Sequence, residues 1–219
     1  MVALPPVTNT AVMAGQPSAR ESVNIGHLVT KRAELTPDVE AIVDTGTGRR
    51  LTFAELNVEV NKVANALSTM GVVSGQSVAL LMMNSADMVA AFFACAKLGV
   101  VVVPVNWRLT VDELAFIVAD AEATVLMYGP EFTGLVGDVR GRSDVVVNHY
   151  VQTGSAPTEP VPEWARELRP LVAGAPAIEI ELNNAAEDLL FIMYTSGTTG
   201  NPKGVMHSHL GVLWAMMTL

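Results

Sequence analysis

The ten residues 195–204, TSGTTGNPKG, combine four hydroxyl side chains, three glycines and one lysine. Glycines let the backbone bend sharply and bring amide N–H groups close to an anion, and hydroxyl groups add further donors. Lys203 supplies a mobile positive charge, which at about 4 Å attracts a phosphate charge by about 4 kcal/mol at intermediate effective dielectric. Each additional hydrogen bond contributes roughly 0.5–1.5 kcal/mol. A segment of this composition can therefore hold a polyphosphate without a cluster of arginines.

The order of these residues differs from that of the Walker loop, G-x-x-x-x-G-K-[ST]. Pro202 precedes the lysine where the Walker loop requires glycine, and Gly204 follows it in place of serine or threonine. The spacing therefore argues against a P-loop kinase or GTPase. Composition alone would suit a flexible surface loop, so the order of the residues has to decide between the two interpretations.

The apolar run 188–194 directly precedes this segment and predicts a buried strand that leads into it. Similar continuous runs predict further buried strands at residues 78–83, 100–103, 124–128 and 144–148. Helical patterns alternate with them, at 88–98 and 110–119, and a strand and the start of a helix follow residue 204. Strands that are apolar on both faces and alternate with helices indicate a mainly parallel sheet flanked by helices, an α/β fold.

Two sequences of capping-box form mark helix starts, Thr52 with Glu55 and Thr110 with Glu113. The first of these helices has apolar residues at helical spacing, so one of its faces should be buried. An earlier helix is expected between residues 24 and 35, a hairpin turn at 45–48 and a short helix at 164–168.

The bulk composition excludes several classes of protein. Half of the 219 residues are apolar, 16% are charged and the formal net charge is -9, so a general nucleic-acid binder is not expected. The single cysteine, Cys95, rules out a disulfide within the chain. The apolar run 88–105 is long enough to cross a membrane, but Lys97, Gly99 and Pro104 interrupt it. A buried helix followed by a buried strand fits this run better.

The segment 194–205, YTSGTTGNPKGV, closely resembles the phosphate loop of the adenylate-forming superfamily, which includes acyl-CoA synthetases and the adenylation domains of peptide synthetases. Two further segments are similar to this family, LTFAEL at 51–56 and PVNWRLTVDEL at 104–114. Thr198 favours the acyl-CoA synthetases, because the peptide-synthetase domains more often carry serine there. The resemblance runs from about residue 24 to the end, which predicts a flexible tail at 1–22 and the first part of a large N-terminal AMP-binding domain at 23–219.

The resemblance also implies roles for individual residues. The expected contacts to the ATP phosphates are Thr195, Ser196, Gly197, Thr198, Thr199, Gly200 and Lys203. His209 falls near the nucleotide and the acyl pocket and is the candidate catalytic residue, although a structural role is equally open for it. His207 matches no reliable family position, and no metal ligand is assigned within the chain.

The family joins a carboxylate to the α-phosphate of ATP with Mg²⁺ and then transfers the acyl group to coenzyme A. The resemblance therefore predicts a cytoplasmic fatty acyl-CoA synthetase, and leaves peripheral membrane contact and a homo-oligomer open. In this family the adenine and acyl pockets, a metal-binding acid and the mobile C-terminal domain lie downstream of the phosphate motif. The chain is therefore expected to be an N-terminal fragment that is inactive alone. Two alternatives stay open: a noncatalytic fragment that binds a nucleotide or a partner, and an adenylating enzyme that loads a carrier protein.

Overall fold

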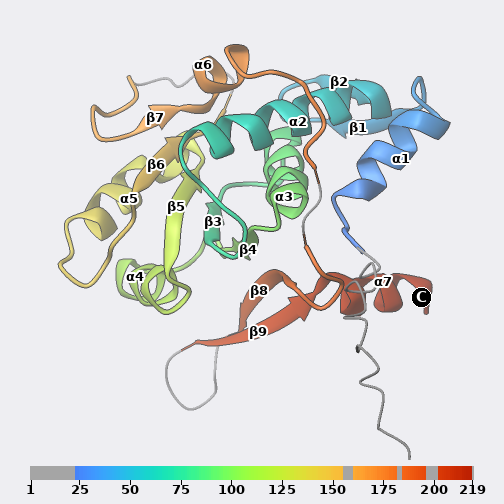
Figure 1. Ribbon diagram of the computed structural model, residues 1–219. Coiled ribbons are helices and arrows are strands. Elements are labelled where there is room, and N and C mark those ends of the chain that lie inside the picture. Colours follow the sequence, from blue (N-terminus) through green and yellow to red (C-terminus); the bar gives the residue numbers. More distant parts are fainter. Residues whose placement is uncertain (1–22, 155–159, 182–183, 196–201, 219) are drawn as a thin grey trace, which may run out of the picture.

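The computed structural model describes residues 23–154, 160–181, 184–195 and 202–218 (Figure 1). The tail predicted for residues 1–22 lies outside the described residues.

A seven-stranded sheet forms the centre of the described chain, in the order β7-β6-β5-β3-β4-β8-β9. Neighbouring strands run parallel, except for the antiparallel pair β8–β9. The strands are β3 (Ser77–Leu81), β4 (Val101–Pro104), β5 (Ala123–Tyr128), β6 (His149–Gln152), β7 (Arg166–Glu167), β8 (Leu189–Thr195) and β9 (Lys203–Ser208). The predicted α/β class with a mainly parallel sheet is therefore confirmed.

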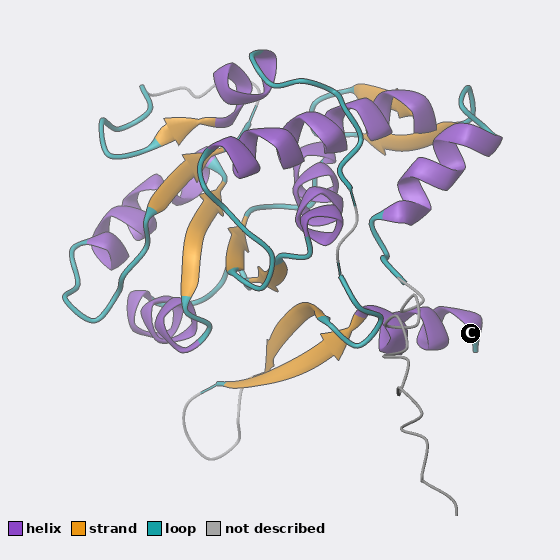
Figure 2. Cartoon of the chain, viewed as in Figure 1, coloured by secondary structure: helices purple, strands orange, loops and turns teal. Residues whose placement is uncertain are grey.

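Helices cover both faces of this sheet (Figure 2). Alternate side chains of β3 point to opposite sides, so that Val78 joins one buried cluster and Ala79 the other. The first cluster includes residues of α2 (Phe53–Thr69), α3 (Ala86–Leu98) and α6 (Leu168–Ala173), and the second includes residues of α4 (Val111–Asp120) and α5 (Thr133–Arg140). Burial on both faces explains why the central strands are continuously apolar.

The remaining elements lie around these two layers. They are α1 (His27–Leu35), the antiparallel pair β1 (Glu40–Asp44) and β2 (Arg49–Thr52), a 3-10 turn at Pro130–Phe132, and α7 (His209–Met217). The first helix and the hairpin turn between β1 and β2 were both predicted.

Both predicted capping boxes are present. The Thr52 hydroxyl accepts from the Glu55 amide, while the Glu55 carboxylate accepts from the Thr52 amide at 2.8 Å, and α4 begins in the same way at Thr110. The run 88–105 is a helix and a strand, as expected, separated by Gly99 in the left-handed region at φ 66°. None of the helices in the described ranges has the length and apolar character needed to cross a membrane.

Two predicted elements were wrong in position. Residues 144–148 form no strand, and the next strand, β6, begins at His149. The valines before it approach the sheet without joining its ladder: Val146 is 80% exposed, and pairing starts where His149 aligns with Val125. The helix expected at 164–168 begins instead at Leu168, directly after the short strand β7.

An ion pair of a fully buried lysine with a partly exposed glutamate holds the segment that leads into β8. The Lys97 side chain is fully buried, and Nζ donates to Asn57 Oδ1 at 2.8 Å, to Asn61 Oδ1 at 2.7 Å and to the Glu179 carboxylate. Glu179 also accepts from Thr30 Oγ1 at 2.7 Å and from Asn61 Nδ2 at 2.9 Å. This cluster, which we call the Lys97 clamp, joins α1, α2 and α3 to the chain just before β8.

Candidate functional site

The β8–β9 hairpin carries the residues that the sequence singled out. β8 lies in the sheet parallel to β4, with Phe191 opposite Val102, and β9 returns antiparallel beside β8. Thr195 ends β8 and Lys203 begins β9, and these two residues are Cα partners at the end of the ladder. Both are exposed. The structure therefore brings these two predicted contacts together at the loop end of the hairpin (Figure 1).

The other predicted phosphate contacts fall between these two residues. They are Ser196, Gly197, Thr198, Thr199 and Gly200, and all of them lie outside the described residues. Their roles stay predictions.

Tyr194 fixes the base of this loop. Its hydroxyl donates to Asp120 Oδ2 at 2.6 Å, at the end of α4, and burial together with this carboxylate raises the pKa of Tyr194. Gly204 lies opposite Tyr194 in the ladder, and a Cβ added there would stand 2.7 Å from Ile192 Cγ2 and 3.2 Å from Tyr194 Cζ. Gly204 thus provides room for the neighbouring side chains within strand β9, and does not bend the chain as its place in a glycine-rich segment suggests.

His209 is the first residue of α7 and is completely buried. Its Nδ1 accepts a hydrogen bond from the Ile25 amide at 3.0 Å, so the neutral ring carries its proton on Nε2. Burial lowers the pKa of His209, and Asp188 opposes this shift. Nε2 is buried and has no partner among the described residues. The arrangement favours a neutral imidazole with one donor available, and whether this donor serves catalysis stays a prediction.

His207 occupies a different environment on β9. Its ring stacks on Phe191 with centroids 4.4 Å apart and planes at 25°. Phe191 in turn contacts Phe92 of α3, with centroids 6.2 Å apart. This stacking gives His207 a packing role in the hairpin.

Within the described ranges, no group of three or more histidine, cysteine or acidic residues is placed to hold a metal ion. Cys95 is buried in the core, where burial raises its thiol pKa to about 12, so it is not a reactive thiolate.

Sequence reasoning missed the residues that support the hairpin from outside the motif. Asp120 is 74 residues from Tyr194, and Glu179 is 82 residues from Lys97. One signal was present: Lys97 interrupts an apolar helix, and a lysine in such a place needs a buried partner. Nothing in the sequence identifies which acid that partner is.

Most of the chain matches a single protein family. The sequence pattern of the family described as AMP-binding enzyme matches residues 29–219. Long-chain-fatty-acid–CoA ligase FadD13 of Mycobacterium tuberculosis is 38% identical over 195 residues, which cover 86% of this chain and 36% of that protein. The 3-hydroxybenzoate–CoA ligase of Aromatoleum sp. is 35% identical over 178 residues, 81% of this chain and 32% of that protein.

A solved structure shows the same fold. The anthranilate CoA ligase AuaEII in complex with anthranoyl-AMP aligns with a TM-score of 0.79 at 31% identity, over 85% of this chain and 35% of that one. The chain thus spans about a third of the length of the relatives that it matches.

Proposed function

Since this chain belongs to the AMP-binding enzyme family, we propose that the hairpin loop between Thr195 and Lys203 binds the phosphates of ATP. The resemblance of residues 194–205 to the adenylate-forming superfamily is confirmed by the family match and by the acyl-CoA ligases among the relatives. One observation carries the proposal: Thr195 and Lys203 are partners at the end of a hairpin that extends from the sheet. Together, Thr195 and Lys203 flank a segment that is rich in glycine and hydroxyl residues.

The reaction we propose for the complete protein has two steps. A carboxylate oxygen of the substrate attacks the α-phosphorus of ATP, and the bond to pyrophosphate breaks as the acyl-adenylate forms. The thiol sulfur of coenzyme A then attacks the acyl carbon, AMP leaves with the electron pair of the broken C–O bond, and the thiol proton goes to solvent. The carboxylate becomes reactive because AMP is a good leaving group.

Thr195 and Lys203 would act on the first step. Negative charge collects on the pyrophosphate as it leaves, and a hydroxyl donor and an ammonium group held beside it stabilise that charge. A bound Mg²⁺ would neutralise further phosphate charge.

The substrate we propose is a fatty acid, because the relative FadD13 is a long-chain-fatty-acid–CoA ligase. The relatives that act on hydroxybenzoate make an aromatic carboxylate the second candidate. We further propose that residues 23–219 form the first part of a larger N-terminal domain, which fits the third of the relatives' length that they cover.

ATP–pyrophosphate exchange in the complete protein tests the proposal, with palmitate and 3-hydroxybenzoate as alternative substrates. Replacing Lys203 by alanine should slow the exchange by about tenfold or more, since a hydrogen bond to a charged group contributes about 1.5–3 kcal/mol. The melting temperature should not change, because Lys203 is exposed. The matched control is Lys31→Ala, which removes another exposed lysine, on α1. Unchanged exchange in Lys203→Ala would contradict the assignment of this residue.

The 219-residue chain should show no exchange by itself, because it covers only about a third of the relatives' length. Robust exchange by this polypeptide would contradict the proposal that the site needs further residues.

A further inference from the structure

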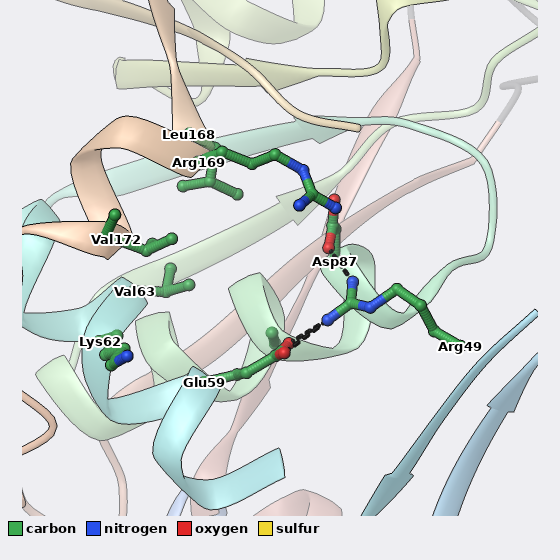
Figure 3. Close-up of a pocket in the computed structure, with 10 residues that line it drawn as sticks. Arg49, Glu59, Lys62, Val63, Asp87, Leu168, Arg169 and Val172 are labelled. Atoms are coloured by element: carbon green, nitrogen blue, oxygen red, sulfur yellow. Dashed lines mark hydrogen bonds and ion pairs between the residues drawn. The ribbon is translucent and has the colours of Figure 1, made fainter. Parts of the chain in front are cut away.

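A cavity of about 460 Å³ lies between α2, α3 and α6 (Figure 3). It is well separated from strands β8 and β9 in Figure 1, and none of the described residues of that hairpin lines it. Its volume falls within the range of about 300–1,000 Å³ that is typical of small-molecule pockets. The nucleotide site proposed above therefore does not account for this cavity.

One side of the cavity is apolar. Val63 of α2 and Ala90 of α3 are buried, and α6 contributes Leu168 and Val172 on the facing wall. In Figure 3 the side chains of Val63, Leu168 and Val172 lie close together on one side of the cavity. An apolar group of a ligand would lose contact with water against these side chains.

The other side is charged and held in a fixed arrangement. Arg49 donates to both oxygens of Glu59, at 2.5 and 2.6 Å, and to Asp87 Oδ1 at 2.8 Å. Burial acts to lower the pKa of Arg49, but the two carboxylates outweigh it and raise that pKa. Asp87 Oδ2 also accepts from the Gly154 amide at 3.1 Å. These hydrogen bonds hold the carboxylates of Glu59 and Asp87 in place, and the charge of Arg49 neutralises part of their negative charge.

Lys62 supplies a positive charge that this network does not use. It is half-buried at the edge of the cavity, and no ion pair or hydrogen bond of its ammonium group occurs among the described residues. Arg169 also lines the cavity, and its Nε donates to the Gly154 carbonyl at 3.1 Å. Among the described lining residues, Lys62 is therefore the cation that the Arg49 network leaves available to a ligand.

We propose that this cavity binds a small organic monoanion with an apolar body, of the class of medium-chain carboxylates. The carboxylate pairs with Lys62 at the edge, and the apolar body packs between Val63, Leu168 and Val172. One negative charge on the ligand matches the ammonium group of Lys62, and the apolar wall disfavours a bare inorganic anion. This site is independent of the proposed nucleotide loop and needs neither ATP nor coenzyme A.

Titration of the protein with sodium octanoate, followed by calorimetry and by backbone amide chemical shifts, tests this proposal. We expect saturable binding, with the shifts concentrated on α2 and α6. Two probes separate the parts of the ligand: 1-octanol has the apolar body without the charge, and inorganic phosphate has charge without the body. Both should bind more weakly than octanoate, and equal affinity for either of them would overturn the proposal.

Variants assign the binding to the cavity. Lys62→Gln should weaken octanoate binding by about three- to fivefold, the range expected for a partly exposed ion pair. The exposed Ala173 lies at the end of α6 on the lining, so Ala173→Phe should narrow the cavity and weaken binding further without disturbing the core. Lys31→Gln, the matched control on α1, should leave the affinity unchanged.

The shift map also separates this proposal from the proposed function. Octanoate shifts confined to β8 and β9, with unchanged affinity in Lys62→Gln, would place the carboxylate at the hairpin and overturn the second site. Weakened octanoate binding in Lys62→Gln together with normal ATP–pyrophosphate exchange by the same variant of the complete protein would support the cavity site and leave the hairpin assignment unaffected.

Discussion

At the scale of single residues, the hairpin positions its two described candidate contacts through their neighbours. Thr195 and Lys203 are exposed partners, and the pair next to them is Tyr194 with Gly204. Tyr194 is held by Asp120, and Gly204 leaves the space that the Tyr194 ring and Ile192 occupy. The packing of the last residue pairs of the hairpin therefore depends on the absence of a side chain at Gly204.

Replacing Gly204 by alanine should lower the free energy of unfolding by about 1–3 kcal/mol, the usual cost of overpacking. The new Cβ would meet Ile192 Cγ2 at 2.7 Å, so the hairpin has to shift. The control is Gly134→Ala on α5, where a Cβ meets nothing within 4 Å. There we expect no loss, or a gain of up to about 1 kcal/mol from helix propensity. Urea unfolding measures both variants, and equal stabilities would contradict the packing role of Gly204.

At the scale of elements, the sequence predicted what depends on local pattern. Continuous apolar runs marked β3, β4, β5 and β8, and the caps at Thr52 and Thr110 marked the starts of α2 and α4. The run of valines at 144–148 was misleading, because strand pairing is decided by the register that β5 offers and not by propensity alone. In the candidate site the motif was visible in sequence. The contacts of Tyr194 with Asp120, of His209 with Ile25 and of Lys97 with Glu179 were not, since each joins residues more than 70 positions apart.

The start of α2 gives a test at this scale. Thr52→Ala removes the hydroxyl that accepts from the Glu55 amide, and the expected loss is about 1 kcal/mol in the free energy of unfolding. Thr52→Ser keeps the hydroxyl and should retain most of this stability. Thermal unfolding of the three proteins measures the difference. If serine and alanine cost the same, then the capping hydrogen bond contributes nothing and the loss has another cause.

At the scale of the whole molecule, the Lys97 clamp joins parts of the chain that the sheet alone does not connect. Thr30 and Glu179 are 149 residues apart in the sequence. The Thr30 hydroxyl donates to the Glu179 carboxylate, and this carboxylate pairs with the ammonium group of the fully buried Lys97. Burial of Glu179 acts to raise its pKa, but the hydrogen bonds from Lys97, Thr30 and Asn61 outweigh this effect and lower that pKa to about 2. Folding therefore favours the charged carboxylate, and the clamp holds the segment that enters β8 and thereby the hairpin.

Removing the acid should cost more than removing the base. Glu179→Gln leaves a buried ammonium group without a countercharge, with an expected loss of about 3 kcal/mol. Lys97→Met leaves a carboxylate that is 36% exposed and can be solvated, so its cost should be smaller.

The pH dependence of stability shows whether the charge of Glu179 is the cause. The pKa of Glu179 is lower in the folded state than its ordinary 4.5, so its stabilisation is present above pH 4.5 and is lost as the pH falls toward about 2. Urea unfolding of the wild type and of Glu179→Gln across this pH interval should show the wild type losing its advantage in the free energy of unfolding as the pH falls. A constant difference between the two proteins across the interval would show that the charge of Glu179 is not what stabilises the clamp.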